Sequence, residues 1–259
     1  GMPWNLKERY GDRASWRRSL RDRASQWGFN YLPPSIGPTA IDPGTVDDPE
    51  RARLLTRTKE WPAQHYAELD FPFTIFLEYP KQYMAGTNMP DVFSDEFAVA
   101  VDSRCKEVCE PLRENSNLIG YHLCHNPPWH PRSKSFDQWI NDATKPGSAG
   151  RKEWVRLMRR IYGTVDRWRR TYGIPVKTWD EIETLDRPLR GYVNERRHLA
   201  DREAFMARIC EQWYRVYHDA IRTYDKNHLI LGDRNTIHLQ PLPECAIRIM
   251  SRGLHGPDR

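Results

Sequence analysis

The sequence has few cysteines and no long apolar run, and these two features set its broad class. Its five cysteines are an odd number without a Cys-x-x-Cys pair, so neither a disulfide framework nor a common zinc spacing is expected. No stretch approaches the roughly 20 apolar residues of a membrane-spanning helix, and the first residues lack the apolar core of a signal peptide. As it stands, the chain is expected to be soluble and cytoplasmic, without a membrane partner. The sequence does not identify the cellular compartment, because an export signal could precede the first residue.

Motifs that mark nucleotide binding and acyl transfer are also absent. No GxGxxG or GxxxxGK[ST] pattern follows an apolar run, and no GxSxG pattern occurs. These patterns normally indicate phosphate-binding loops and serine nucleophiles. We therefore expect no cofactor and find no support for acyl-transfer chemistry.

The charge of the chain is nearly balanced. Lysine and arginine number 40 against 35 acidic residues, which gives a net charge of +5. The densest basic run lies on a predicted helix whose other side carries Trp16, Leu20, Ala24 and Trp27; it consists of Arg17, Arg18, Arg21 and Arg23. We interpret this run as a solvated helix face and expect no nucleic-acid partner. Nucleic-acid binding by this helix is a weaker hypothesis, and it would give an affinity that falls steeply with salt.

Aromatic residues are abundant and apolar runs alternate with amphipathic segments. With 10 Trp, 12 Tyr and a hydrophobic fraction of 39%, the 259 residues predict one ordered domain over 1–259. Helices are predicted over 12–28, 50–69, 94–112, 154–172, 205–220 and 243–250, and strands over 29–32, 73–80, 118–124 and 228–233. Alternating helices and buried strands favour a parallel sheet. The prediction is an α/β fold, a partial (β/α)8 TIM barrel with parallel strands and surrounding helices, and with a long loop insertion at about 125–150.

Four segments carry a family resemblance. They are Trp27–Asn30, Pro90–Phe97, Asn117–Tyr121 and Asp225–Arg234, and in this order they resemble segments of agarase-like and β-galactosidase-like glycoside hydrolases. The resemblance implies a TIM barrel that acts on or binds a β-linked polysaccharide or oligosaccharide. It also implies that the first strand would precede residue 1 and the nucleophile strand would follow Arg259, so that a second copy of the chain could complete the barrel as a homo-oligomer.

The chain departs from this family at one functional position. In such families the strand that begins Ile-Gly-Tyr usually ends in Asn-Glu, and the glutamate acts as general acid and base. Here the strand leads into His125-Asn126-Pro127-Pro128, so that glutamate has no counterpart. The alternative hypothesis is therefore a non-catalytic carbohydrate-binding or scaffold protein derived from a glycosidase barrel.

Candidate site residues follow from the barrel prediction, because the carboxyl ends of the strands form the site in such folds. Glu78 and Asp233 are the candidate catalytic carboxylates, since a glycosidase needs two; an ion pair for Glu78 and a salt bridge or turn cap for Asp233 are the structural alternatives. His122, Cys124, His125 and His130 form a cluster that resembles a metal site, but its spacing fits no common zinc pattern and we expect no metal. The candidate carbohydrate-binding residues are Asn30, Tyr79, His122, His125, Asn126, Trp129, His130, Arg234, Asn235 and His238.

Overall fold

The computed structural model describes residues 8–33, 70–77, 90–125, 140–141, 143–186 and 195–234. The side chains of Arg13, His125, Glu195 and Arg234 are not among those described. The chain divides into two compact units. The first contains Gly1–Glu78, Cys105–Cys124 and Ile221–Arg234, and the second contains Tyr79–Arg104, His125–Ala220 and Asn235–Arg259.

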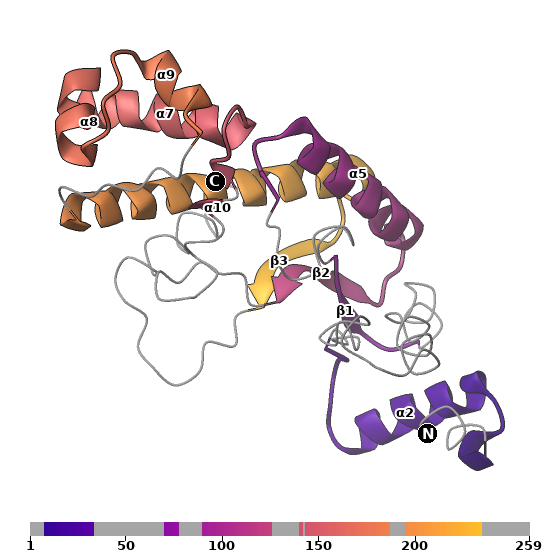
Figure 1. Cartoon of the computed structure of the whole chain (residues 1–259). Helices are drawn as coiled ribbons and strands as arrows, with labels where there is room; N and C mark the ends of the chain where they lie inside the picture. The colour runs from indigo at the N-terminus through magenta and orange to yellow at the C-terminus, as the bar shows by residue number, and fades with distance from the viewer. Residues whose placement is uncertain are drawn as a thin grey trace. The chain divides into compact units, whose positions relative to one another are not determined.

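Helix α2 of the first unit spans Arg13–Gln26 and begins and ends where the sequence predicts (Figure 1). The Asp12 carboxylate accepts a hydrogen bond from the Ser15 amide at 2.7 Å, which caps the first turn. At the other end, Gly28 has a φ of +79°, a left-handed conformation that glycine adopts readily. Trp27 was expected on the buried side of this helix, and this expectation is wrong. Its side chain is 68% exposed, because the helix ends at Gln26 and Trp27 is its C-cap.

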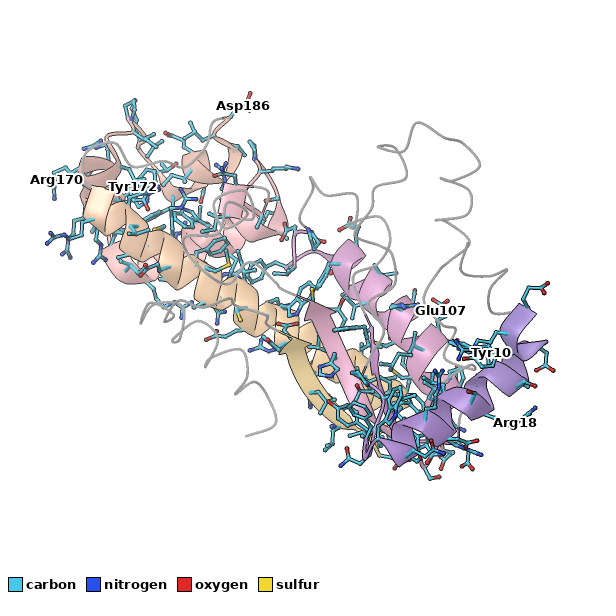
Figure 2. The ribbon with its side chains drawn as sticks, turned by 90° about the horizontal axis from the view of Figure 1, so that it is seen from below. Tyr10, Arg18, Glu107, Arg170, Tyr172 and Asp186 are labelled. Atoms are coloured by element: carbon cyan, nitrogen blue, oxygen red, sulfur yellow. The ribbon has the colours of Figure 1, made fainter. Side chains whose placement is uncertain are left out.

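The sheet of the first unit contains β1 (Phe73–Phe76), β2 (Leu118–His125) and β3 (Leu229–Arg234) in the order β1-β2-β3. Strands β1 and β2 pair in parallel, with Phe76 opposite His122, and Leu32 forms a parallel bridge to Phe73. The arrows of β2 and β3 point the same way in Figures 1 and 2. The predicted parallel arrangement of consecutive strands is therefore confirmed. The described residues show three strands and one bridge, and a closed eight-stranded barrel is not seen among them.

One face of this sheet is packed into the core of the first unit. Tyr121 and Leu123 of β2 are fully buried, as are Cys105 and Cys109 of α5 (Asp95–Cys109). Leu112, in the short 3-10 helix η4 (Glu110–Leu112), is 2% exposed. Successive side chains of a strand point to opposite faces, so Tyr121 marks the packed face and His122 marks the other. Gly120 allows β2 and β3 to approach closely, because a Cβ there would clash with the carbonyl of Leu229.

The second unit is helical over its described residues. Its elements are α7 (Ala149–Tyr162), α8 (Val165–Tyr172), α9 (Trp179–Thr184) and most of α10 (Glu195–Tyr224), together with the start of α5. The sequence predicted one continuous helix over 154–172, and this is wrong. Gly163 has a φ of +73° and ends α7, and Thr164 starts α8 by accepting a hydrogen bond from the Arg167 amide at 3.4 Å. In such a break, glycine ends one helix and a capping residue starts the next. The helical spacing of apolar residues in the sequence continues across the break and does not reveal it.

The helical spacing of Trp154, Trp168 and Trp213 in the sequence predicts that these side chains belong to the core, and this prediction is confirmed. Trp154, Trp168 and Trp213 are 1%, 0% and 0% exposed. Trp168 stacks on Tyr172 with 4.4 Å between ring centroids, and Trp213 stacks on Phe97 at 5.5 Å. Stacked and edge-on aromatic pairs add stability beyond the area that they bury. Predicted elements over 50–69, 78–80 and 243–250 lie outside the described residues, as does most of the predicted insertion.

Candidate functional site

The carboxyl edge of the sheet carries two of the predicted site residues within the first unit. His122 lies in β2, opposite the last residue of β1, and Asp233 is the penultimate residue of β3. Since parallel strands end at one edge of a sheet, the two residues approach that edge from neighbouring strands. In open and closed parallel sheets alike, ligands bind outside the carboxyl ends of the strands.

The backbone directs these two side chains differently. Phe76 and His122 lie side by side, with 5.4 Å between ring centroids, on the face opposite Tyr121, and two-residue alternation places Gly120 on that face too. Gly232 has a φ of +71° and interrupts the alternation of β3 just before Asp233, so the strand pattern places Asp233 at the carboxyl edge without assigning it to one face. Both side chains are half-buried, and the atoms His122 Nδ1 and Asp233 Oδ1 are themselves buried.

These groups are suited to hydroxylated ligands. A carboxylate accepts hydrogen bonds from hydroxyl groups, and an imidazole can both donate and accept them. Among the described side chains, Asp233 is the carboxylate at this edge, whereas the retaining mechanism needs a pair about 5 Å apart.

The other predicted residues are distributed as follows. Asn30 is exposed and precedes Leu32, which pairs with the first residue of β1. It therefore lies at the amino end of the sheet, away from His122 and Asp233. The backbones of His125 and Arg234 belong to β2 and β3, but their side chains are outside the described set. Outside the described residues altogether are Glu78, Tyr79, Asn126, Trp129, His130, Asn235 and His238.

The packed face of the sheet holds a polar cluster that sequence reasoning missed. The Tyr121 hydroxyl donates to Asp225 Oδ2 at 2.6 Å, and His228 Nδ1 lies 2.6 Å from the same oxygen. The other oxygen, Oδ1, accepts from the amides of Asn227 at 2.8 Å and His228 at 3.1 Å. Tyr121 and Asp225 are 104 residues apart, so spacing along the chain gives no signal of this contact.

The protonation states in this cluster are set by burial and hydrogen bonding. Burial acts to raise the pKa of Asp225, but the hydrogen bonds from Tyr121, His228 and two amides outweigh it and hold that pKa below its usual value. Burial, followed by the neighbouring Cys109, raises the pKa of Tyr121. The hydrogen bond with Cys105 and then burial raise the pKa of Cys109. The aspartate is thus charged while the phenol and thiol keep their protons.

The geometry of this cluster indicates a structural role. His228 Nε2 lies 3.0 Å from the Asn115 carbonyl, and a carbonyl oxygen can only accept, so Nε2 carries a proton. With Nδ1 directed at Asp225, neither ring nitrogen is available as a base toward a substrate. The cluster instead joins β2 to the start of β3 and to the loop before β2. Asn227 Nδ2 adds to this connection by donating a hydrogen bond to the Arg113 carbonyl at 2.9 Å.

A second buried carboxylate lies in the helical unit. Both Tyr162 and Tyr172 donate to Asp201 Oδ2, and the Arg197 Nε lies 3.4 Å from Oδ1. Burial raises the pKa of Asp201 and raises that of Tyr162 to about 12. The carboxylate side chain is 2% exposed, so this cluster too joins α7, α8 and α10 rather than facing a ligand.

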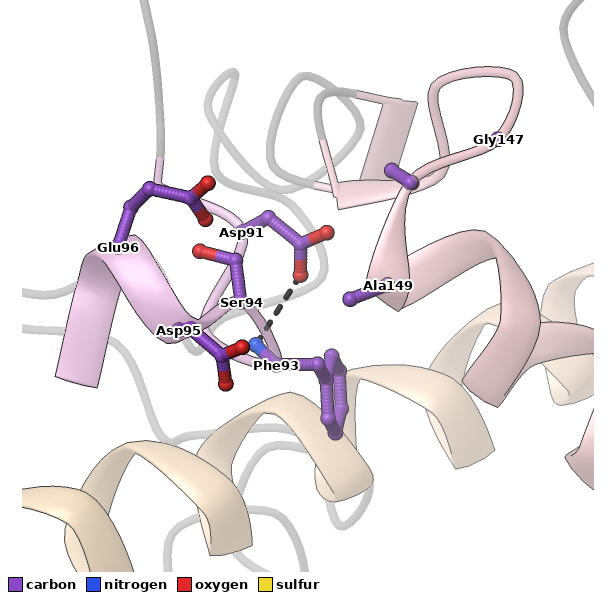
Figure 3. Close-up of a pocket in the computed structure, with 8 residues that line it drawn as sticks. Asp91, Phe93, Ser94, Asp95, Glu96, Gly147 and Ala149 are labelled. Carbon is purple, nitrogen blue, oxygen red and sulfur yellow. Dashed lines mark hydrogen bonds between the residues drawn. The ribbon is translucent and has the colours of Figure 1, made fainter.

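A cleft of about 620 Å³ lies beside the start of α5 (Figure 3). Asp91 lies at its base and accepts hydrogen bonds from the amides of Phe93 at 3.0 Å and Gly150 at 2.7 Å. Burial raises the pKa of Asp91. Because both carboxylate oxygens are used to cap backbone amides, the arrangement joins the start of α5 to the start of α7. The cleft is lined by Asp91, Phe93, Ser94, Asp95, Glu96, Gly147, Ser148 and Ala149.

Replacing Gly150 with alanine is expected to lower the free energy of unfolding by about 1–3 kcal/mol, the usual cost of overpacking. The new Cβ would clash with the Ala143 carbonyl and lie 2.9 Å from Asp91 Oδ1. Chemical denaturation of the full chain measures the change. Lys152→Ala, at an exposed position of the same helix, is the control, and equal stability of the two variants would contradict the close contact.

Among the side chains that the structure describes, no group of three His, Cys, Asp or Glu could hold a metal ion; the side chains of His125 and His130 are not among them. No helix in the described ranges has the length and apolar character needed to cross a membrane. The four described cysteines are buried and form no disulfide with one another; they are Cys105, Cys109, Cys124 and Cys210.

Comparisons with known proteins place this geometry in context. No family model and no curated protein matches the sequence. Solved structures do match: PfGH50B, an exo-beta-agarase and the agarase AgWH50C each superpose with a TM-score of 0.68 over 96% of this chain. The chain shares its fold with part of each of these structures. Sequence identities are 19%, 21% and 16%, and the chain spans about a third of each structure, namely 34%, 32% and 34%. At such identities the similarity establishes the fold alone.

Proposed function

We propose that this chain is a glycoside-hydrolase-like protein that binds or acts on a β-linked polysaccharide or oligosaccharide at the carboxyl edge of its sheet. The observation that carries the proposal is the superposition of 96% of the chain on agarases. The position of His122 and Asp233 at that edge supports it, because ligands of parallel sheets bind there.

Under this proposal, Asp233 and Glu78 are the two carboxylates of a hydrolytic reaction. One would protonate the leaving oxygen while the other attacks the anomeric carbon or activates water. His122 would bind a sugar hydroxyl, and Tyr79 and Trp129 would stack on sugar rings. The remaining polar candidates around the strand ends would complete the hydrogen bonding; they are His125, Asn126, His130, Arg234, Asn235 and His238.

The second candidate function is carbohydrate binding without hydrolysis. It is favoured by the residues that follow Cys124, where His125 and Asn126 stand in place of the Asn-Glu pair typical of the resembling families. Neither side chain supplies the carboxyl group that acts as general acid in most glycosidases. Binding and turnover must therefore be measured separately.

Titration with agarose-derived oligosaccharides tests the proposal. We expect Asp233→Asn and His122→Ala each to weaken binding about tenfold or more, since each removes hydrogen bonds worth on the order of 1.4 kcal/mol. Calorimetry measures the affinity, and Asp219→Asn serves as the control because its carboxylate is 65% exposed on α10. Failure of the wild-type chain to bind, or unchanged affinity in both variants, would remove the proposal.

Release of reducing ends from the same oligosaccharides separates the two candidate functions. Turnover by the wild-type chain that disappears in Asp233→Ala indicates a glycosidase. Binding without turnover across the pH range indicates the non-catalytic alternative. Turnover that persists in both Asp233→Ala and Glu78→Ala would contradict the assignment of these carboxylates.

A further inference from the structure

Three aromatic side chains are exposed directly after α2. Trp27, Phe29 and Tyr31 are 68%, 59% and 43% exposed, and among the described residues they are the exposed large aromatic side chains. Aromatic residues ordinarily bury most of their area, and a cluster of exposed rings marks a binding surface. Because the segment enters the sheet at the amino end of β1, this surface is distinct from the carboxyl edge described above.

The backbone holds this segment rigidly at both ends. The Phe29 amide donates to the Ala24 carbonyl at 2.9 Å and the Gly28 amide donates to the Ser25 carbonyl at 3.0 Å, which is the paired arrangement that ends many helices. Beyond Tyr31, the Leu32 amide donates to the Pro72 carbonyl at 2.8 Å and the Leu32 carbonyl accepts from Thr74 at 3.1 Å. The backbone is thus ordered before a ligand arrives, which lowers the entropic cost of binding.

An arginine side chain lies beside one of the exposed rings. The guanidinium of Arg23 lies 5.9 Å from the centre of the Trp27 ring, and no ion pair of Arg23 with a carboxylate occurs among the described residues. Arginine recognises sulfate-like and carboxylate anions through its planar set of donors, so the charge beside the rings is complementary to an acidic ligand.

We propose that Trp27, Phe29, Tyr31 and Arg23, here called the aromatic platform, form a docking surface for an acidic polysaccharide. The rings stack on sugar faces, and Arg23 binds a sulfate or carboxylate substituent. The choice of a polysaccharide rests on the proposed function. Exposed rings beside arginine also suit single-stranded nucleic acid, but the similarity in fold to agarases favours sugar.

The full-length chain is tested by affinity electrophoresis through gels that contain a sulfated galactan or neutral agarose. We expect the double variant Trp27→Ala/Tyr31→Ala to lose about tenfold or more in affinity for the sulfated galactan. Arg23→Gln is expected to weaken retention by the sulfated galactan more than retention by agarose. Leu199→Ala, which truncates a side chain that is 50% exposed elsewhere, is the control and should behave as wild type. Because the substituted aromatic side chains are exposed, circular dichroism spectra should match wild type.

Additional measurements distinguish between the possible ligands of the aromatic platform. They also separate a failure of this inference from a failure of the proposed function. Oligosaccharide binding that depends on Asp233 should be unaffected by the platform variants, so failure at one surface is distinguishable from failure at the other. Unchanged retention in the double variant overturns the inference. Tighter binding of a 20-nucleotide thymidine strand than of the galactan also overturns it, as does a wild-type dimer that the double variant converts to a monomer in light scattering.

Discussion

Replacing Asp225 with alanine is expected to lower the free energy of unfolding by about 3–5 kcal/mol, the usual cost of breaking a buried charged pair. Its carboxylate is fully buried, 2.6 Å from both the Tyr121 hydroxyl and His228 Nδ1. Alanine would leave a phenol, an imidazole and two amides without their acceptor. Urea denaturation measures the change. Asp219→Ala removes an exposed carboxylate from α10 and should cost less than about 0.5 kcal/mol; similar losses in the two variants would contradict the role of the cluster.

The same residue predicts a pH dependence. Hydrogen bonding lowers the pKa of Asp225 below its usual 3.8, so the unfolded chain binds a proton at a higher pH than the folded chain. Its stabilisation is fully present above the unfolded pKa and is lost as the pH falls through the folded pKa. Buried Asp91 and Asp201 have raised pKa values and act in the opposite direction. The difference in stability between wild type and Asp225→Ala isolates the Asp225 contribution, which should shrink below about pH 4.

Replacing Arg151 with methionine is expected to lower the free energy of unfolding of the helical unit by about 3 kcal/mol or more. The side chain is 1% exposed and donates to the carbonyls of Thr144 at 2.6 Å, Ile182 at 2.9 Å and Leu185 at 3.2 Å. Burial lowers its pKa to about 10, which leaves the guanidinium charged at neutral pH. Methionine retains much of the volume but leaves the buried carbonyls unpaired, at about 1–3 kcal/mol each.

Thermal and urea unfolding of Arg151→Met are best compared with those of Lys152→Met, because Lys152 is the exposed neighbour on the same helix. Arg151→Lys should fall between wild type and Arg151→Met, since an ammonium cannot reproduce the planar set of donors. Equal stability of Arg151→Met and Lys152→Met would show that the three carbonyls find other partners.

Capped and glycine-terminated segments were predicted well because their signals are local. Asp12 and Gly28 bound α2 as expected, and Ser94 Oγ accepts from the Phe97 amide at 3.2 Å at the start of α5. The apolar runs that became β1, β2 and β3 were also read correctly as consecutive parallel strands. Each of these features depends on interactions within a few residues or on a pattern repeated along one strand.

The candidate site was predicted in part. The strand-end argument placed His122 and Asp233 at the carboxyl edge, and the pairing register adds that His122 lies beside Phe76. The left-handed conformation of Gly232 within β3 was not predicted. The break at Gly163 within an unbroken apolar pattern and the exposure of Trp27 beside Arg23 were likewise not predicted. The exposure of Trp27 depends on which surfaces meet, and short-range rules leave this open. The break at Gly163 had a local signal, because Gly163 and the N-cap residue Thr164 stand next to each other between the two helices.

The sequence by itself determined where most helices and strands form, in what order the strands follow and which side chains stand at strand ends, because hydrogen bonding and apolar periodicity act over a few residues. Tertiary structure alone decided that Tyr121 meets Asp225 across 104 residues, that Phe76 and His122 lie side by side, and that the rings after α2 stay exposed. These outcomes depend on close packing between segments distant in the chain, where burial and complementarity of shape select the partners.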